Sequence, residues 1–252
     1  MGNDRVQITY DLNFTTLFHF GTGIRAGLID RTVVRDGEGY LYVPGSTIKG
    51  VLREHCEQLA RIYKHQLSSP HNEKAALYEL GTLPPSLVTR IFGSHVTSGT
   101  LYFENAVLEE EDKPRSDHPR PRIREKYREM QVDLYTQVRL NRLTRTSVPG
   151  ALYTSEFGTN ESVFHGSIEG WLNCTSLDGL GTPAPSYSLL LLLAGMRMID
   201  RLGGNKSTGK GACSCDITSI RLKGQEIAPQ VWSGWLAHVG RLAEFDAQGR
   251  EK

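Results

Sequence analysis

The sequence predicts an α+β fold built around one antiparallel sheet, and three observations support this prediction. A long segment near the N-terminus alternates apolar and polar residues, and segments 100–108, 162–174 and 212–222 are strand-like as well. Segments 46–62 and 186–202 are helix-like. The resulting order is strand, helix, strand, insertion, strand, helix, glycine-rich loop and strand. This order is typical of a ferredoxin-like βαββαβ sheet, which RNA-recognition domains also use.

The first strand is predicted from the parity of its apolar residues. Those on even positions are Val6, Ile8, Tyr10, Leu12, Phe14, Phe18 and Phe20. Alternation over this length is typical of a strand with one buried face. It places His19 on the face opposite the phenylalanines.

A glycine-rich loop at 21–36 follows this strand and is a candidate functional site. It holds three glycines, two aspartates (Asp30 and Asp36) and interleaved arginines that include Arg25. Glycine lets a ligand approach the backbone closely, and loops often carry function. Asp36 is expected to open a turn before a short strand at 40–43. A solvated connection without a site is the alternative.

The first helix is predicted to start at Ser46, which follows Pro44-Gly45 and can cap it. Its free amides and the positive end of its dipole then face whatever lies above them. Lys49 and Arg53 stand one turn apart on one face. Amides, dipole and two cations together suit phosphate, whereas the alternative is a surface helix with solvated cations.

A basic stretch lies in the middle of the chain, after a less regular helical segment at 71–80. Residues 113–145 hold ten Lys and Arg against four acidic residues, a local net charge of +6 that the overall +1 conceals. Prolines at 114, 119 and 121 favour an irregular segment there. Phosphate binding explains such charge, and a solvated loop is the alternative.

A β-hairpin is predicted at 138–153, with Val148-Pro-Gly at or near its tip. Its arginines, which include Arg142 and Arg145, and its leucines would give an extended finger with basic and apolar surfaces. An amphipathic helix is expected to close the chain at 231–245.

The loop 203–211 nearly spells the phosphate-binding motif of nucleoside triphosphatases, starting at Gly204. It fails because Gly211 stands where the magnesium-binding hydroxyl is needed, and because it joins a helix to a strand in that order. A nucleoside triphosphatase is therefore excluded. Exposed amides and two lysines can still hold backbone phosphates. The candidate RNA-binding residues of this loop are Gly203, Gly204, Lys206, Ser207, Gly209 and Lys210.

The bulk composition is that of an ordinary globular protein. The 252 residues are 38% hydrophobic and 23% charged. No stretch reaches the ~20 apolar residues of a membrane span, and no signal peptide is visible. The four cysteines show neither a disulfide framework nor a Cys-x-x-Cys pair. These features predict a cytoplasmic protein without a membrane partner.

At this point the motifs resemble the RAMP superfamily, and in particular the repeated backbone subunit of type III CRISPR effector complexes. The motifs are Phe18-His-Phe-Gly-Thr-Gly23, Gly27-Leu-Ile-Asp30, Val43-Pro-Gly-Ser-Thr-Ile-Lys-Gly50 and Gly203-Gly-x-x-x-x-Gly-x-Gly211. The glycine loop alone marks only the superfamily, whereas its combination with the Pro-Gly-Ser-Thr-x-Lys-Gly segment is specific.

The resemblance implies a single RAMP domain over 1–252 with a ferredoxin-like palm, a helical insertion and a thumb hairpin. The expected bounds are 5–50, 98–110 and 160–225 for the palm, 46–97 for the helical insertion, 111–137 for a basic insertion and 138–158 for the thumb. In that family, copies stack along a guide RNA and each thumb wedges into the guide–target duplex. Guide RNA, target RNA, other effector subunits and copies of the chain itself are therefore the expected partners.

The resemblance also implies roles for particular residues. The aspartate that cuts the target RNA matches Asp30, which could accept a proton from the 2′-hydroxyl or hold Mg²⁺. The palm loops would hold the guide backbone. The residues expected to bind RNA are His19, Arg25, Ser46, Lys49, Arg53, Arg142 and Arg145, together with the six named in the loop 203–211.

Three functions remain open from the sequence. The first is a guide-binding subunit that cuts target RNA through Asp30, with Asp36 as the second choice of aspartate. The second is a structural RNA-binding subunit that does not cut. The third is a metal-independent ribonuclease that processes precursor guide RNA with a histidine base such as His19. Many relatives carry zinc ligands before the Phe-Gly that matches Phe92-Gly93, but 86–91 has no cysteine, so no structural zinc is expected.

Overall fold

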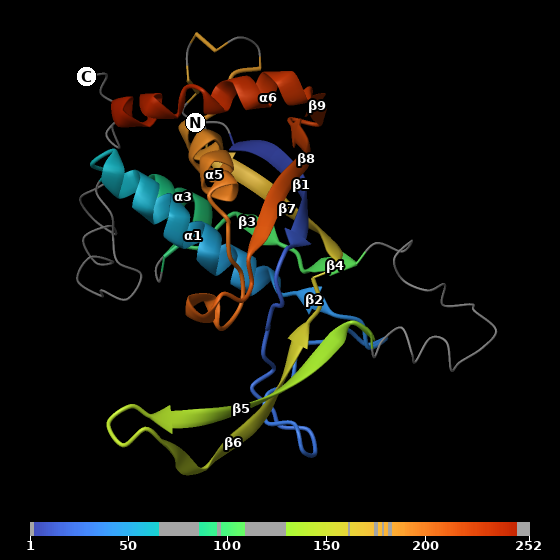
Figure 1. Cartoon of the computed structure of the whole chain (residues 1–252). Helices are drawn as coiled ribbons and strands as arrows, with labels where there is room; N and C mark the ends of the chain where they lie inside the picture. The colour runs from blue at the N-terminus through green and yellow to red at the C-terminus, as the bar shows by residue number, and fades with distance from the viewer. Residues whose placement is uncertain are drawn as a thin grey trace, which may run out of the picture.

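A computed structural model of the chain describes residues 3–65, 86–94, 97–108, 130–160, 162–173, 176–177, 179–180 and 183–245. It has a body of sheet and helices from which a long β-hairpin projects (Figure 1). The strands are β1 (Asn3–Phe14), β2 (Tyr42–Val43), β3 (Leu101–Phe103), β4 (Ala106–Leu108), β5 (Val132–Asn141), β6 (Thr146–Gly158), β7 (Val163–Asn173), β8 (Cys213–Leu222) and β9 (Gln225–Ile227). The helices are α1 (Gly45–Ile62), α3 (Leu87–Phe92), α5 (Tyr187–Arg197) and α6 (Pro229–Leu236), with 3₁₀ turns η1 (Lys206–Thr208) and η2 (Val239–Glu244).

The main sheet has the predicted ferredoxin-like topology. Its strands run in the order β2-β4-β7-β1-β8-β9, with β3 also paired to β7, and all the pairings are antiparallel. β7 therefore lies between β1 and the short strands β3 and β4, which are reached through α1. This is the split βαβ arrangement that the element order indicates.

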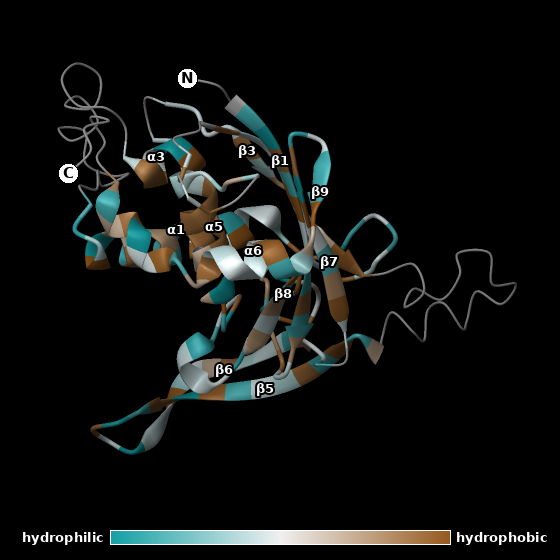
Figure 2. Cartoon of the chain, turned by 90° about the horizontal axis from the view of Figure 1, so that it is seen from above, coloured by the Kyte–Doolittle hydropathy of each residue, from teal (hydrophilic) through white to brown (hydrophobic). Residues whose placement is uncertain are grey.

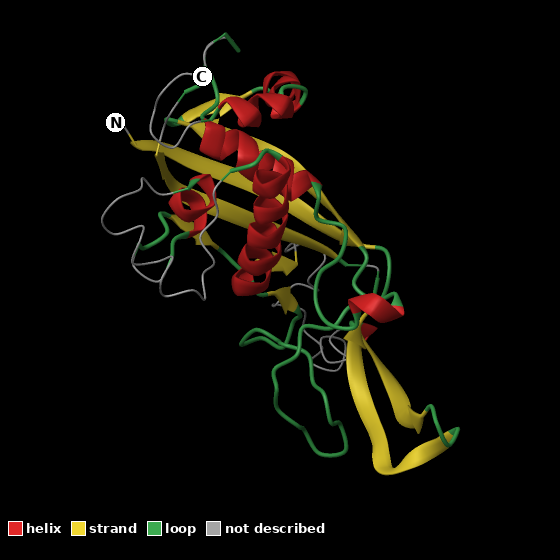
Figure 3. Ribbon diagram, turned by 90° about the vertical axis from the view of Figure 1, so that its left-hand side faces the viewer, coloured by secondary structure: helices red, strands yellow, loops and turns green. Residues whose placement is uncertain are grey.

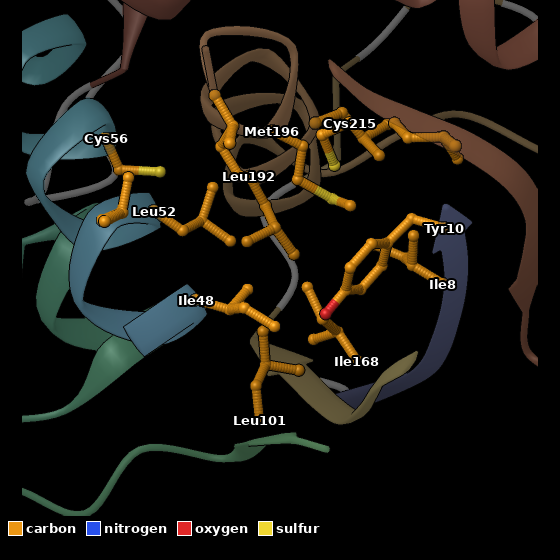
Figure 4. Packing of buried hydrophobic residues seen from close by; sticks show 14 of the residues in the cluster. Ile8, Tyr10, Ile48, Leu52, Cys56, Leu101, Ile168, Leu192, Met196 and Cys215 are labelled. Atoms are coloured by element: carbon orange, nitrogen blue, oxygen red, sulfur yellow. The ribbon is translucent and has the colours of Figure 1, made fainter. Parts of the chain in front are cut away.

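The parity rule in β1 correctly predicts the buried face of the sheet. The even residues from Val6 to Phe14 are at most 3% exposed, and Phe18 and Phe20 stay buried beyond the end of the strand. The helices α1 and α5 pack over this face (Figure 3). In the core between sheet and helices, Leu192 of α5 and Ile48 of α1 lie between Leu52 on one side and Ile8 and Tyr10 on the other (Figure 4).

The helix α5 explains the run of five leucines at 189–193, all of which are fully buried. It packs against α1, α3, α6 and η2, so apolar residues face a neighbour on every side (Figure 2). Ser186 caps it by accepting a hydrogen bond from the Leu189 amide. Within the described residues, no helix is long and apolar enough to cross a membrane.

We expect Leu192→Ala to lower the free energy of unfolding by about 2–5 kcal/mol, because it removes fully buried methyl groups and leaves a cavity. Urea denaturation followed by circular dichroism measures this. The matched control is Leu28→Ala, since Leu28 is 95% exposed and its truncation should change stability by less than about 0.5 kcal/mol. Equal effects of the two variants would contradict the packing described.

The projecting hairpin differs from its predicted bounds. It begins at Val132, so 132–137 belong to β5 and not to the basic insertion. Its tip is the turn 142–145 and not Val148-Pro-Gly, which lies inside β6. The strand pairing shifts register between Val138 and Leu140, opposite this proline segment. An irregularity of this kind is where a strand tolerates proline.

Other element boundaries also need correction. The strand expected at 100–108 is divided into β3 and β4, and the helix expected at 186–202 ends at Arg197. The closing helix is divided into α6 and η2. The helix α1 begins at Gly45 with Pro44 at its N-cap, so Ser46 does not cap it. The predicted helical segment 71–80 and most of the basic insertion, 111–129, lie outside the described residues.

Candidate nucleic-acid interface

The first glycine-rich loop is an ordered hairpin. Bridges pair Gly21 with Val33 and Ala26 with Ile29. Gly27, with a φ of 58°, takes the left-handed conformation that this narrow turn requires. The two bridges fix the base of the loop, and its apolar tip projects into solvent.

The returning half of this loop lies along the edge of β6 (Figure 1). The Asp30 and Arg31 amides donate to the Thr154 carbonyl at 2.9 and 3.2 Å, and the Glu156 amide donates to the Arg31 carbonyl at 2.9 Å. Arg31 pairs with Ser155 in a parallel bridge. The loop is thus attached to the edge of the two-stranded hairpin by a single parallel bridge.

The Asp30 carboxylate lies at this junction. Its Oδ2 accepts a hydrogen bond from the Thr154 amide at 3.0 Å, and its Oδ1 lies 3.6 Å from Nε of Arg25. The Asp30 side chain is 31% exposed and that of Arg25 is 80% exposed. One carboxylate oxygen is therefore held by the hairpin, while the other lies beside the exposed guanidinium of Arg25.

Asp36 has a different role, in agreement with the expected turn. Its Oδ1 accepts hydrogen bonds from the amides of Glu38 and Tyr40, both at 2.9 Å. An aspartate that binds backbone amides two and four residues onward stabilises a turn. Of the two candidate aspartates, Asp30 is the one whose side chain bonds the hairpin in the described part of the chain.

His19 lies between the hairpin and the loop 203–211. Its Nδ1 is 2.8 Å from the Glu156 carbonyl oxygen, and its ring centroid is 5.6 Å from that of Phe157. A carbonyl only accepts, so Nδ1 carries the proton and Nε2 is the unprotonated nitrogen of the neutral ring. The His19 carbonyl in turn accepts from the Gly204 amide.

The loop 203–211 packs closely against the chain before it. Gly203 has a φ of 89°, and a Cβ there would lie 2.7 Å from the His19 carbonyl oxygen. The amides of 204, 208, 209, 210 and 211 donate to carbonyls of the protein. Most of the amides expected to bind phosphate therefore already donate to carbonyls of the protein. The groups of this loop that can bind a phosphate are the ammonium groups of Lys206 and Lys210.

One face of the hairpin is aromatic and cationic. The Lys210 ammonium lies 5.0 Å from the ring centroid of Tyr135 and 5.2 Å from that of Phe157, and the Arg31 guanidinium lies 5.0 Å from that of Tyr153. Tyr135 is 41% exposed. Aromatic rings beside cations suit the bases and phosphates of single-stranded RNA. Arg31, Tyr135 and Tyr153 are not among the RNA-binding residues predicted from the sequence, although tyrosines among basic residues in a hairpin indicate such a surface.

The other face of the hairpin carries exposed apolar residues, and its tip is basic. Leu134, Val138 and Leu152 are 59%, 46% and 69% exposed. The tip carries both predicted arginines, Arg142 and Arg145, which are exposed. The projecting hairpin thus combines exposed apolar and basic residues, and hydrophobic and hydrophilic segments both occur along it (Figure 2).

The three α1 residues are not equivalent. Ser46 is exposed at the first turn, and the Lys49 ammonium lies 5.8 Å from the ring centroid of Phe103. Arg53 is directed inward: its Nε bonds Glu57 at 2.9 Å and its Nη1 donates to the Gly93 carbonyl at 3.0 Å. Its side chain is 18% exposed, which fits a structural role.

A metal ion bound here would take most of its ligands from the RNA and from water. Among the described residues, no group of three or more His, Cys, Asp or Glu is arranged to hold one. Mg²⁺ is often bound by one or two carboxylates together with substrate phosphates, and the solvent-facing Oδ1 of Asp30 fits such a site. On α1, which packs against α3, Cys56 donates to the Leu191 carbonyl, and burial raises the pKa of its thiol. The absence of structural zinc stays a prediction.

The fold defines a ferredoxin-like palm with a projecting hairpin, and comparison with known proteins identifies the family. The model of the RAMP superfamily matches residues 11–214. The chain therefore belongs to the RAMP superfamily.

Solved structures agree with this assignment at the level of the fold. A chain of the type III-B Cmr-beta complex bound to cognate target RNA, solved by cryo-EM, superposes with a TM-score of 0.56 at 11% identity, covering 84% of this chain and 96% of that one. A chain of the apo state of Cmr-beta gives a TM-score of 0.52 at 12% identity, covering 84% and 97%. A search of curated proteins found no match.

Proposed function

We propose that this protein is a guide-RNA-binding subunit of a type III CRISPR effector complex and that it cuts guide-complementary target RNA through Asp30. The observation that carries this proposal is the attachment of Asp30 to a projecting hairpin through the Thr154 amide. Membership of the RAMP superfamily and the fold shared with Cmr-beta chains support the same class. Its partners are guide RNA, target RNA and other effector subunits, which include copies of itself.

In the proposed reaction, the RNA supplies its own nucleophile. The 2′-oxygen attacks the adjacent phosphorus, the bond from phosphorus to the 5′-oxygen breaks, and a cyclic phosphate and a 5′-hydroxyl result. Asp30 accepts the 2′-hydroxyl proton, and water protonates the leaving oxygen. The exposed guanidinium of Arg25, 3.6 Å from Asp30, can exchange its carboxylate partner for the scissile phosphate.

Asp30 is also the residue that would hold Mg²⁺, together with phosphate oxygens of the RNA. Bound there, the ion would polarise the phosphoryl oxygen. The hairpin amide that bonds Oδ2 leaves Oδ1 for this contact.

The guide RNA is assigned to the aromatic and cationic face of the hairpin and to the loop 203–211. Lys206 and Lys210 neutralise its phosphates, and Tyr135 and Tyr153 offer rings on which bases stack. His19 lies between these two elements and contacts the same strand of RNA.

The proposed function is tested with the assembled complex. The chain is co-expressed with its neighbouring effector subunits and a guide, and the complex is incubated with labelled complementary RNA in Mg²⁺ or in EDTA. We expect guide RNA to co-purify, and target RNA to be cut in Mg²⁺ only. A complex that binds its target without cutting it would identify a structural subunit instead.

The isolated chain tests the remaining alternative, a ribonuclease that processes precursor guide RNA. The observation that favours it is the hydrogen bond from Nδ1 of His19 to the Glu156 carbonyl, because in the neutral ring it leaves Nε2 as the nitrogen that can accept a proton. Clean cleavage of precursor repeat RNA in EDTA, lost in His19→Ala, would establish that function in place of the proposed one.

A further inference from the structure

Glu156 is a buried carboxylate on β6, and both of its oxygens accept hydrogen bonds from the first glycine-rich loop, 21–36. The side chain is 10% exposed. Its Oε2 accepts a hydrogen bond from the Val33 amide at 3.0 Å, and its Oε1 accepts one from Nη2 of Arg35 at 3.1 Å. A buried charge is costly unless it is paired, so these two bonds make the position of the loop depend on that of the hairpin.

Together with backbone hydrogen bonds, these two bonds attach the segment that contains Asp30 to β6. The backbone bonds to Thr154 and from Glu156 fix the loop at residues 30 and 31. The Glu156 side chain fixes it again at 33 and 35, so the segment is held at both ends. The Glu156 carbonyl also accepts the hydrogen bond from His19. Glu156 of the hairpin thus bonds both the first glycine-rich loop and His19.

We propose that Glu156 is a positioning residue for Asp30. Glu156 holds the first glycine-rich loop against β6. The position of the hairpin on the RNA therefore determines which phosphate Asp30 reaches. The inference rests on the proposed cleavage by Asp30 and adds to it a determinant of the cut site. Exchange of Glu156 for alanine removes the side-chain bonds to Val33 and Arg35 while leaving the backbone contacts of Asp30 and Arg31 with β6.

A residue that only stabilises the fold and a positioning residue have different consequences for the products. Loss of fold stability lowers the amount of active complex but leaves the cut positions unchanged. Loss of positioning keeps the target bound and lets Asp30 reach neighbouring phosphates. The mapped 5′ ends of the products distinguish these two cases.

The experiment uses the whole complex under single-turnover conditions, with target affinity and product ends measured for each variant. We expect Glu156→Ala to cut on the order of a hundredfold more slowly, as a small displacement of a reacting group does, and at scattered positions. Target affinity should remain as in the wild type. Glu156→Gln keeps an acceptor for the Val33 amide, so it should retain the cut sites and stay within about tenfold of the wild-type rate.

The control is Glu169→Ala, which removes a glutamate that pairs with Arg5 at 3.9 Å on the palm sheet. It should change neither rate nor cut sites. Hydrogen exchange of the Val33 amide supplies a readout that needs no cleavage, and it should become faster in Glu156→Ala alone. Unchanged exchange and cut sites in Glu156→Ala would overturn the inference. A wild-type complex that fails to cut would instead overturn the proposed function, and with it the role of Glu156 in selecting a phosphate.

Discussion

Asp30→Asn is expected to abolish cutting of a guide-complementary RNA by the assembled complex while leaving target binding intact. Asparagine keeps a side-chain oxygen that accepts from the Thr154 amide, so the loop stays attached to the hairpin. It loses the negative charge that accepts a proton or holds a cation. We expect single-turnover cleavage to fall by about 10²–10⁴-fold, the usual contribution of a general base.

The matched control for this variant is Asp36→Asn. It keeps the acceptor that organises the turn to Tyr40, and it removes a charge of the same sign from the same loop. Its cleavage rate should equal that of the wild type. Cutting by Asp30→Asn at full rate would remove Asp30 from the mechanism, and an equal loss in both variants would attribute the effect to the charge of the loop as a whole.

The fold could be predicted from the sequence wherever one face of an element is buried. The parity of β1 identifies its core face because every even side chain from Val6 to Phe14 packs under helices. The five leucines of α5 fix a buried helix for the same reason. Apolar residues of the hairpin such as Leu134, Val138 and Leu152 are instead exposed, so no burial requirement marks where its strands begin.

The hairpin turns after Asn141 and not at the Pro-Gly sequence that commonly marks a turn. Val148-Pro-Gly is accommodated opposite a shift in register, inside β6. The turn instead follows Asn141, whose Oδ1 accepts from the Leu143 amide at 3.0 Å, and ends at Arg145 with a φ of 54°. An asparagine that bonds the backbone two residues onward is itself a turn signal, and here it prevails.

The candidate site could be predicted only in part, because its decisive contacts are long-range. The motif selects Asp30, but its partner Thr154 lies 124 positions away, and Glu156 lies 123 positions from Val33. No local pattern pairs residues at such separations. Arg53 shows the converse: a cation spaced for phosphate on α1 turns inward to Glu57 and Gly93.

The double variant Lys206→Gln, Lys210→Gln should weaken binding of guide RNA by about the same factor for every sequence. Each lysine that neutralises a phosphate of single-stranded RNA contributes about 0.7 to the slope of log K against log salt, so the slope should become shallower by about 1.4. Fluorescence anisotropy with the full chain, at several salt concentrations and with unrelated RNA sequences, measures both quantities.

Single variants separate the roles of the two lysines. Lys210 also lies over the rings of Tyr135 and Phe157, so Lys210→Arg, which keeps a cation there, should retain most of the affinity. Lys223→Gln is the control, because this exposed lysine pairs with Asp4 at 3.1 Å at the end of β8. An unchanged salt slope in the double variant would exclude the loop 203–211 from phosphate binding. A change in base preference would mean that the loop reads bases, and the guide backbone would then have to be held by other cations, such as Arg31 beside Tyr153.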